Sequence, residues 1–453
     1  MAGTDLHQSE DVPQITGPLG DFVEFRNGRS SPDRTDSGAF AVYGSNGEIG
    51  KADVTNAPDG TLIVGRVGSY CGSVHYSPNK CWVTDNAIIG RSRSQKDSRF
   101  WFYKLASLEL NNHRAGSGQP LLNQQILNSI RVSIPACEDD RFQIARVLAA
   151  FDDKIDLNRR INQTLEAMAQ AIFKSWFVDF DPVKAKIAAK LEGRDPLRAA
   201  MSAISGKLNT ELDTLPREQF DPLAATAALF PDEIEESELG EIPKGWTLLK
   251  VRDVCESIFS GGTPDTRRPE YWGGTLLWFS SGETRERVVV DTEKRINELA
   301  VENSSTRLAR PGDILIASAG QGLTRGQTSY CAVETYINQS VVAIRVAPDR
   351  AHPAWLFNNL LGRYEEMRSI SDSHSSRGSL TTKLIGGMHI VCPPTDVMAR
   401  YGGLVDLLLQ QQALDRLTAK ALANLRDALL PRLISGELSV DSIGAAAGTS
   451  ETT

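Results

Sequence analysis

One uninterrupted stretch, residues 141–177, most constrains the fold of this 453-residue chain. It contains no Gly or Pro, and apolar residues recur at alternating steps of three and four. This pattern predicts a helix of about nine turns with a narrow apolar seam. Such a helix usually packs along a second helix, and the alternative is an ordinary amphipathic helix on one domain. The seam comprises Ile144, Leu148, Phe151, Ile155, Asn158, Asn162, Leu165, Ala169, Ile172 and Trp176.

A second long helix is expected over about 397–430, after Pro393 and Pro394, and Pro431 is expected to kink or end it. Two helices of similar length can pack against each other, and antiparallel packing would send one globular domain to each end. Amides in the middle of a seam lower stability but can fix register, so Asn158 and Asn162 are predicted to hold the antiparallel register. The expected stripe of the second helix comprises Leu404, Leu407, Leu408, Gln411, Leu414, Leu417, Leu422, Leu425 and Leu429.

Length and composition predict a cytoplasmic protein of two or more domains. No apolar run reaches membrane-spanning length, and the polar, acidic start is unlike a secretory signal. The six cysteines form no CxxC pair, which favours a reducing compartment and argues against structural zinc. The net charge is −8, but residues 178–245 alone hold fourteen acidic and eight basic residues. The flanking regions are therefore nearly neutral.

The pattern of elements predicts two mixed α+β regions separated by the long helices. Short β-rich runs fill the first region, with a helix over 99–110, and similar runs fill the second, with a helix over 353–367. The connecting segment is acidic, rich in Ala and Pro, and expected to be partly ordered. The predicted boundaries are a disordered tail 1–15, a first domain 16–140, the central helix 141–178, a linker 179–240, a second domain 241–395, the distal helix 396–436 and a disordered tail 437–453.

The two halves of the chain follow the same plan. Gly60–Ile63 corresponds to Gly312–Leu315, and Trp101 corresponds to Trp355. Ile134-Pro135 likewise corresponds to Cys392-Pro393, and the offset between the halves drifts only from 252 to 258 along the chain. The constant order of elements predicts a duplicated unit of one domain and one long helix, with pseudo-twofold symmetry.

Several stretches resemble recurring motifs of the DNA-specificity subunits of type I restriction-modification enzymes. Two of them are distinctive together, the run Ser-Trp-Phe-Val-Asp-Phe-Asp-Pro at 175–182 and the run Gly-Glu-Ile-Pro-Lys-Gly-Trp at 240–246. The resemblance covers roughly residues 15–440. The other motifs lie at 43–50, 148–158, 228–231, 260–264 and 430–438.

The resemblance implies two target recognition domains, each recognising one half of a split, asymmetric sequence in double-stranded DNA. It also implies that the helices form a spacer that recruits two methyltransferase subunits, which methylate adenine with S-adenosylmethionine. Motor-nuclease subunits that use ATP and Mg²⁺ can join through the methyltransferase. A protein of this family serves host defence and carries no catalytic residue or cofactor itself.

Motifs for catalysis are missing from the sequence in agreement with that implication. The single Pro-Pro pair lacks the flanking residues of an amino-methyltransferase loop, and no phosphate-binding loop is present. The six histidines show no metal-ligand spacing. Gly65–Gly68 is interpreted as a turn, and Asp152 and Asp153 are interpreted as part of a solvated helix flank.

Side chains that can recognise base edges are expected in loops on the rigid domains. Any one of them could be an ordinary surface cation or turn residue. Arg66 and Arg325 stand out because each follows the corresponding strand of its repeat, in a Gly/Ser loop. The candidates in the first domain are Arg29, Ser30, Tyr43, Ser45, Asn46, Arg66, Tyr70, Arg91, Arg93, Lys96 and Arg114. Those in the second domain are Thr263, Thr266, Arg267, Arg268, Arg285, Arg287, Gln321, Thr324, Arg325, Arg377 and Lys383.

Three alternatives stay open at this point: a helical adaptor that does not contact DNA, a specificity subunit of a methylation-only system, and a self-contained enzyme. Under the DNA interpretation, the seam from Ile144 to Trp176 acts as a ruler. Its length of about 50 Å is on the order of one and a half turns of B-DNA, so helix length should set the spacing between half-sites.

Overall fold

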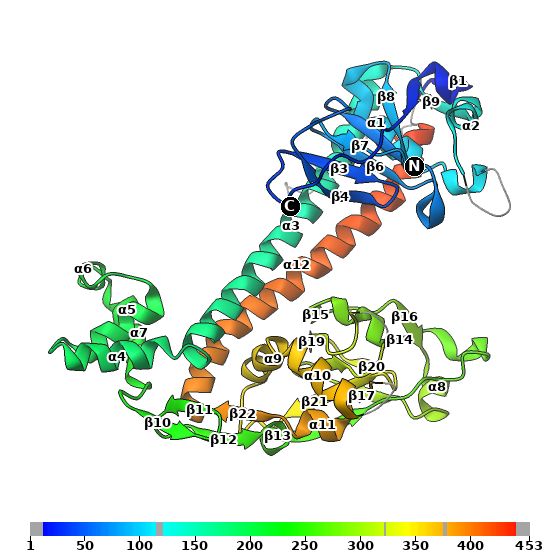
Figure 1. The fold of residues 1–453 in the computed structure, drawn as a ribbon. Coiled ribbons are helices and arrows are strands. Elements are labelled where there is room, and N and C mark those ends of the chain that lie inside the picture. Colours follow the sequence, from blue (N-terminus) through cyan, green and yellow to red (C-terminus); the bar gives the residue numbers. More distant parts are fainter. Residues whose placement is uncertain (1–11, 115–120, 321–322, 375–377, 441–453) are drawn as a thin grey trace, which may run out of the picture. The chain divides into compact units, whose positions relative to one another are not determined.

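The computed structural model describes residues 12–114, 121–320, 323–374 and 378–440, and the chain divides into two compact units. Unit 1 combines both chain ends, residues 1–157 and 419–453, whereas unit 2 comprises residues 158–418. The boundary falls inside both long helices, α3 (Glu138–Phe177) and α12 (Thr395–Ser435). Each unit therefore contains a sheet-rich domain and one part of each helix (Figure 1).

Unit 1 is built on a four-stranded antiparallel sheet with the strand order β2-β8-β5-β6. A three-stranded sheet, β4-β3-β7, pairs β3 with β7 in parallel. Helix α1 (Ser98–Ala106) buries Phe100, Trp101 and Leu105 in the core, and the short helix α2 spans Gln124–Ser129. The strands are β1 (Gln14–Pro18), β2 (Val23–Asn27), β3 (Phe40–Gly44), β4 (Gly47–Ala52), β5 (Thr61–Gly65), β6 (Val74–Ser77), β7 (Trp82–Val83), β8 (Ala87–Ser92) and β9 (Arg131–Pro135).

Both chain ends contribute to the core of unit 1. Leu433 and Ile434, near the end of α12, are 0% and 4% exposed among residues of the sheet and of α3. Residues 14 and 15, expected in a disordered tail, begin β1 (Gln14–Pro18), which pairs with β9. Leu438, expected in the other tail, packs against the same core. Strand pairing thus orders the first segment, and an apolar contact orders the second.

Unit 2 repeats this architecture with one extra strand on each sheet. Its five-stranded sheet has the order β13-β21-β18-β19-β15, and its four-stranded sheet has the order β16-β14-β20-β17. A two-stranded pair joins β12 (Thr247–Lys250) to β22 (His389–Cys392). The other strands are β13 (Cys255–Ser260), β14 (Trp272–Phe279), β15 (Val288–Val289), β16 (Lys294–Ile296), β17 (Arg307–Ala309), β18 (Ile314–Ala317), β19 (Thr328–Cys331), β20 (Thr335–Ile337) and β21 (Val341–Val346).

The predicted internal repeat is confirmed by topology. The order β2-β8-β5-β6 recurs as β13-β21-β18-β19, and the parallel pair β3 with β7 recurs as β14 with β20. The predicted helix over 353–367 is two helices, α9 (Pro353–Leu361) and α10 (Tyr364–His374), followed by the short α11 (Thr382–Gly386). The α+β class of both domains is confirmed.

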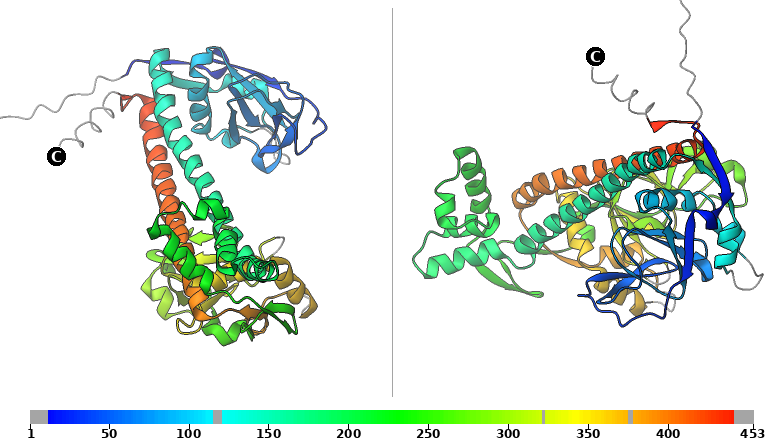
Figure 2. Two further views of the ribbon diagram at one scale, coloured as in Figure 1. Left: turned by 90° about the vertical axis from the view of Figure 1, so that its left-hand side faces the viewer. Right: turned by 90° about the horizontal axis from the view of Figure 1, so that it is seen from above.

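Helices α3 and α12 run antiparallel in each unit, and both views in Figure 2 show them side by side. In unit 2 the amide of Asn158 donates to the Asp415 carbonyl at 3.5 Å, and that of Asn162 donates to the Gln412 carbonyl at 3.3 Å. Both amides are buried, as the seam predicted. Their role in fixing the register stays a prediction.

The predicted stripe of α12 is out of phase with the packed face. Leu404, Leu414 and Leu425 are 39%, 57% and 49% exposed, and Leu407 and Leu417 are also exposed. The buried line instead follows Tyr401, Val405, Leu409, Gln412 and Asp415, with Leu408, Leu422 and Leu429 at its border. The prediction failed because leucines occupy two faces of α12, whereas polar Gln412 and Asp415 occupy the face that meets α3.

Pro431 was expected to kink or end the second long helix, but it does not end α12, which continues to Ser435. A proline inside a helix removes one backbone hydrogen bond. Here the last turn carries Leu433 and Ile434 into the core of unit 1, and this burial compensates for the lost bond.

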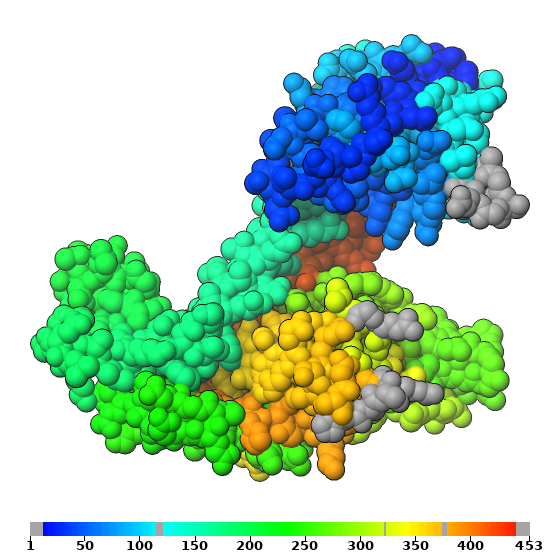
Figure 3. Space-filling view, in the orientation of Figure 1, coloured from blue at the N-terminus to red at the C-terminus, as the bar shows by residue number. Residues whose placement is uncertain are grey.

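The connecting segment is more ordered than predicted. It forms α4 (Asp181–Leu191), α5 (Pro196–Ser205), α6 (Asn209–Leu212) and α7 (Arg217–Ala228), followed by the hairpin β10 (Ile234–Ser237) and β11 (Gly240–Pro243). The helices share a small core around Ala200, Met201, Leu212 and Ala227. In the space-filling view of Figure 3, α4–α7 form a lobe that projects from the rest of unit 2.

Candidate nucleic-acid interface

In unit 1 the sheet brings most predicted candidates to one end, where β5 stops at Gly65. The turn between β3 and β4 lies here, because the Ser45 hydroxyl donates to the Asn86 carbonyl. Arg29 lies at the same end, in a bridge with Thr84. Candidates at this end, which we call loop end 1, are Arg29, Ser30, Tyr43, Ser45, Asn46, Arg66 and Tyr70.

Arg66 is held by its backbone and leaves its side chain weakly engaged. Its N–H donates to the Asn86 carbonyl at 2.9 Å, and its own carbonyl accepts from Leu122 at 3.0 Å. The guanidinium makes one long contact, 3.4 Å from Nη1 to the Asp85 carbonyl. Its Nε is buried and has no partner among the described residues. A rigidly placed guanidinium with spare donors suits a bidentate contact to guanine.

Three residues with ring side chains lie in or next to the segments of loop end 1. Tyr70 is 52% exposed, so its ring is available for stacking on a base or sugar. Tyr43 is half-buried, and burial is the main reason that the pKa of its phenol is raised. His75 lies beside Gly47, and burial lowers the pKa of its imidazole, which therefore stays neutral at pH 7.

Arg91 and Arg93 lie at the opposite end of the same sheet. The antiparallel register places Arg91 opposite Glu24 and Ser92 opposite Val23, away from Gly65. The Arg93 guanidinium donates to the Gly20 carbonyl at 3.0 Å. Lys96 pairs with Asp139 at the start of α3, and Arg114 is exposed. The structure therefore does not bring Arg91, Arg93 and Lys96 to loop end 1, whereas Arg114 lies close enough to Cys71, next to Tyr70, to act on that thiol electrostatically.

Unit 2 has an equivalent loop end, where β18 stops at Ala317. The Ser318 N–H donates to the Ser340 carbonyl at 2.8 Å, and the Thr263 hydroxyl donates to the Gln339 side chain. Thr324 is half-buried in the loop that follows β18. We call this set, Thr263, Thr324, Arg325 and Gln339, loop end 2. The candidates Gln321 and Arg377 lie outside the described residues.

Arg325 differs from its counterpart Arg66, because its guanidinium is already occupied. Nη1 donates to the Gly378 carbonyl at 2.6 Å, and Nη2 pairs with the Asp372 carboxylate of α10. The side chain is only 12% exposed. The equal placement predicted for the two arginines therefore holds for the backbone but not for the charged groups.

The remaining candidates of unit 2 are scattered. Arg267 pairs with Asp265 at 3.0 Å and Arg285 with Glu293 at 2.5 Å, so both cations are partly neutralised on the surface. Arg268 stacks on Tyr271, with 5.5 Å between guanidinium carbon and ring centroid. Thr266 is exposed in the same loop.

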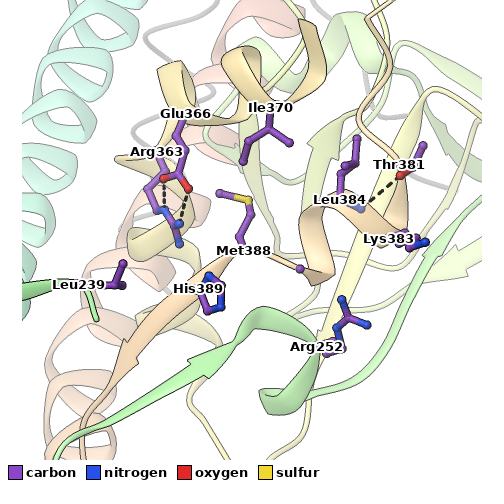
Figure 4. A pocket seen from close by; sticks show the side chains of 11 residues that line it. Leu239, Arg252, Arg363, Glu366, Ile370, Thr381, Lys383, Leu384, Met388 and His389 are labelled. Atoms are coloured by element: carbon purple, nitrogen blue, oxygen red, sulfur yellow. Dashed lines mark hydrogen bonds and ion pairs between the residues drawn. The ribbon is translucent and has the colours of Figure 1, made fainter. Parts of the chain in front are cut away.

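Lys383 lines a pocket of about 860 Å³ between α10, α11 and β22 (Figure 4). Arg252 faces the same space and donates to the Gly386 carbonyl at 3.1 Å. Arg363 is matched by Glu366 through contacts of 2.6 and 2.7 Å. Three cations therefore line the pocket, Arg252, Arg363 and Lys383, together with apolar residues that include Met388.

Sequence analysis missed a second set of charges, which attach the domains to the helices. Asp152, interpreted as solvated, accepts from Tyr103 and Arg426 at 2.5 Å each. Arg287, a candidate for DNA contact, pairs with Glu166 of α3 at 3.2 Å. Both groups are partly buried in their own unit. Asp152 directly follows the seam residue Phe151 in the heptad pattern, and this position could have indicated that it lies near the packed face of α3.

The described residues contain no group of three or more side chains suited to hold a metal ion. Likewise, none of the described helices combines the length and apolarity needed to cross a membrane. The chemistry of the two loop ends is that of hydrogen bonding by amides, hydroxyls and guanidinium groups.

Comparisons with known proteins agree with this picture. Residues 15–167 match the family model described as type I restriction modification DNA specificity domain. The type I restriction enzyme HindI specificity subunit of Haemophilus influenzae is 29% identical over 335 residues, 70% of this chain and 71% of that protein. The MjaIX specificity subunit of Methanocaldococcus jannaschii is 24% identical over 363 residues, 79% of this chain and 72% of that protein.

A solved structure shares the fold. The crystal structure of the type I restriction-modification S subunit from M. genitalium aligns with a TM-score of 0.57 and 13% identity, covering 95% of this chain and 98% of that chain. The family model, the curated relatives and the repeated two-domain topology agree with one another. The chain is therefore similar to type I restriction-modification DNA specificity subunits, in its first domain by the family model and over 70–79% of its length by the curated relatives.

Proposed function

We propose that this chain is a non-catalytic specificity subunit that recognises a bipartite DNA sequence, with one half-site at each loop end. The observation that carries the proposal is the repeated topology, which places polar loops after β5 and after β18 on equivalent sheets. Rigid loops with amide, hydroxyl and guanidinium groups are suited to base recognition.

The two loop ends differ in chemistry, so the two half-sites should differ in sequence. Loop end 1 offers the weakly engaged Arg66 and the exposed Tyr70. Loop end 2 offers Thr263 and Gln339, while its arginine is paired with Asp372. Guanine is the expected contact of an arginine, and adenine is a common contact of glutamine. The proposed target is therefore asymmetric.

The experiment is selection of bound duplexes from a random-sequence library by the full-length chain with its methyltransferase partner. The proposal predicts enrichment of two short sequences separated by an unspecified spacer of fixed length. Enrichment of a single continuous sequence, or of none, would contradict it. An adaptor that does not contact DNA would give no enrichment.

We further propose that the helices recruit two methyltransferase subunits. The outward face of α12 in unit 2 carries the exposed residues Leu404, Leu407, Leu414 and Leu417. Apolar side chains recurring at helical spacing on an exposed face suit docking of a partner helix. S-adenosylmethionine would then be bound by the methyltransferase, and ATP and Mg²⁺ by any motor-nuclease subunit. The assembly would act on cytoplasmic DNA.

Co-purification tests this partner. Leu407→Asp with Leu414→Asp should abolish recovery of the methyltransferase subunit with tagged chain, because a carboxylate on an apolar docking face is left desolvated. Leu191→Asp, on the 84% exposed Leu191 of α4, is the matched control. Full recovery with the double variant would exclude this face. The presence or absence of a motor-nuclease gene separates a restriction system from a methylation-only system.

A further inference from the structure

A network of charged side chains attaches the recognition domain of unit 2 to both long helices. The Glu286 carboxylate pairs with Arg416 of α12, and the neighbouring Arg287 pairs with Glu166 of α3 at 3.2 Å. Glu166 also attracts Arg416 electrostatically, so opposite charges alternate through all four groups. Three segments that are distant in sequence thereby meet in one network.

The two domain-borne charges are rigidly connected to the sheet. The Arg287 carbonyl accepts from the Tyr330 N–H at 2.7 Å, and its guanidinium donates to the Thr328 carbonyl at 3.4 Å. The Glu286 carbonyl accepts from the Ser329 hydroxyl at 2.7 Å. All three partners belong to β19, which is the neighbour of β18. Movement of this domain relative to the helices would therefore break the ion pairs.

Unit 1 has a network with the same plan and different residues. From α1, Arg99 pairs with Asp153 of α3 at 2.9 Å, and the Tyr103 hydroxyl donates to Asp152 at 2.5 Å. Arg426 of α12 binds the other oxygen of Asp152 at 2.5 Å. Here too, side chains of the domain contact α3 directly, and a carboxylate–arginine pair makes the connection to α12.

Burial distinguishes Arg416 from an ordinary surface cation, since its side chain is only 23% exposed. Burial is the main cause that lowers the pKa of Arg416, and the charge of Glu166 opposes it. Arg416 Nε is buried and has no partner among the described residues. A partly desolvated guanidinium depends on its carboxylates, because an unpaired charge in such a place is strongly unfavourable.

We infer that these networks are orienting braces, in which Arg287, Glu166, Arg99 and Asp153 act as positioning residues that fix the rotation of each recognition domain on its helices. The inference rests on the proposed bipartite recognition. A domain held at one rotation accepts its half-site at one place along the DNA. The braces therefore determine how strictly the spacer length is discriminated, without contacting a base.

The test uses the full-length chain with its methyltransferase partner and duplexes that carry the two half-sites selected by the wild type. Spacer lengths vary in steps of one base pair around the selected length. The variants are Arg287→Gln, Glu166→Gln and their combination, which removes both charges together. The control is Arg295→Gln, because Arg295 pairs with Asp291 at 2.9 Å within the domain.

The double variant should keep both half-site sequences and raise binding to spacers one base pair too long or too short by about fivefold relative to the selected length. The single variants should be non-additive in this ratio, because they remove the same interaction. Arg99→Gln with Asp153→Asn in unit 1 should produce the same broadening. Circular dichroism confirms that each variant is folded.

Spacer discrimination equal to that of the wild type and of Arg295→Gln in both double variants would overturn the inference. A uniform loss of affinity at every spacer length would also overturn it, since that result indicates a merely structural role. If the wild type selects no two-part sequence, the proposed function itself fails. The two failures are therefore distinguishable.

Discussion

Replacing Arg66 and Arg325 separately by alanine should affect DNA binding very unequally. By sequence the two arginines are equivalent, because each lies in the Gly/Ser loop after the corresponding strand. The structure leaves the Arg66 guanidinium with one long contact, whereas Arg325 is bound to Asp372 and to the Gly378 carbonyl. Only Arg66 is available for a base without first breaking other bonds.

The magnitudes follow from these contacts. A bidentate arginine–guanine contact contributes about 1–3 kcal/mol, so Arg66→Ala should weaken binding by roughly 5- to 150-fold. Arg325 must first release an ion pair worth about 0–1 kcal/mol and a hydrogen bond worth about 1 kcal/mol. These costs offset much of any new contact, and Arg325→Ala should weaken binding by less than about fivefold.

The assay is competition binding to the duplex selected by the wild-type complex, measured by fluorescence anisotropy at several salt concentrations. Arg131→Ala is the matched control for unit 1, because Arg131 lies exposed on β9 and is no candidate for DNA contact. Asp372→Asn should free Arg325 and increase affinity modestly. Loss of a base contact should also relax sequence preference at one position of the half-site.

Two results would refute this reasoning. Unchanged affinity and unchanged salt slope for Arg66→Ala would remove Arg66 from the interface. Equal and large losses for Arg66→Ala and Arg325→Ala would show that the pair of Arg325 with Asp372 does not restrain it.

Three further predictions concern the scaffold. Trp176→Ala should lower the free energy of unfolding by about 3–5 kcal/mol, because Trp176 is 2% exposed against Phe230 and Tyr401; urea titration measures this, and Leu191→Ala should change it by less than about 0.5 kcal/mol. Inserting seven residues in both α3 and α12 should lengthen the selected spacer by about three base pairs, at 1.5 Å per residue, with both half-sites unchanged; an unchanged spacer would refute the ruler. Burial lowers the pKa of the His75 imidazole in the folded chain. Neutral His75 therefore contributes stability above the unfolded pKa of about 6.5, and this contribution is lost as the pH falls through the folded pKa. The His75→Gln variant should lose less unfolding free energy than the wild type between pH 7.5 and 5.5, and equal losses would contradict this.

Local patterns were sufficient to predict the long helices, the duplicated domains and the seam of α3. The seam residues from Ile144 to Trp176 are buried or half-buried, because α3 has one apolar face and no competing stripe. The contact face of α12 could not be predicted, since its leucines populate two faces and its buried line includes Gln412 and Asp415. Helix phase is then decided by the partner helix, which local sequence does not contain.

The candidate site was predictable as a location but not as a set of contacts. Strand order carried Ser45 and Arg66 to one loop end, and the repeat carried Thr263 and Arg325 to its equivalent. The pairing of Arg325 with Asp372 joins residues 47 positions apart through α10, so no local pattern indicates it. The charge networks escaped prediction for the same reason.

The assembly of unit 1 from both chain ends has a consequence for synthesis. Leu433 and Ile434 complete a core that otherwise consists of residues from the first third of the chain. The first recognition domain can therefore close its core only after the last turn of α12 has left the ribosome. A chain interrupted before that turn lacks Leu433 and Ile434 and leaves the core of unit 1 incomplete.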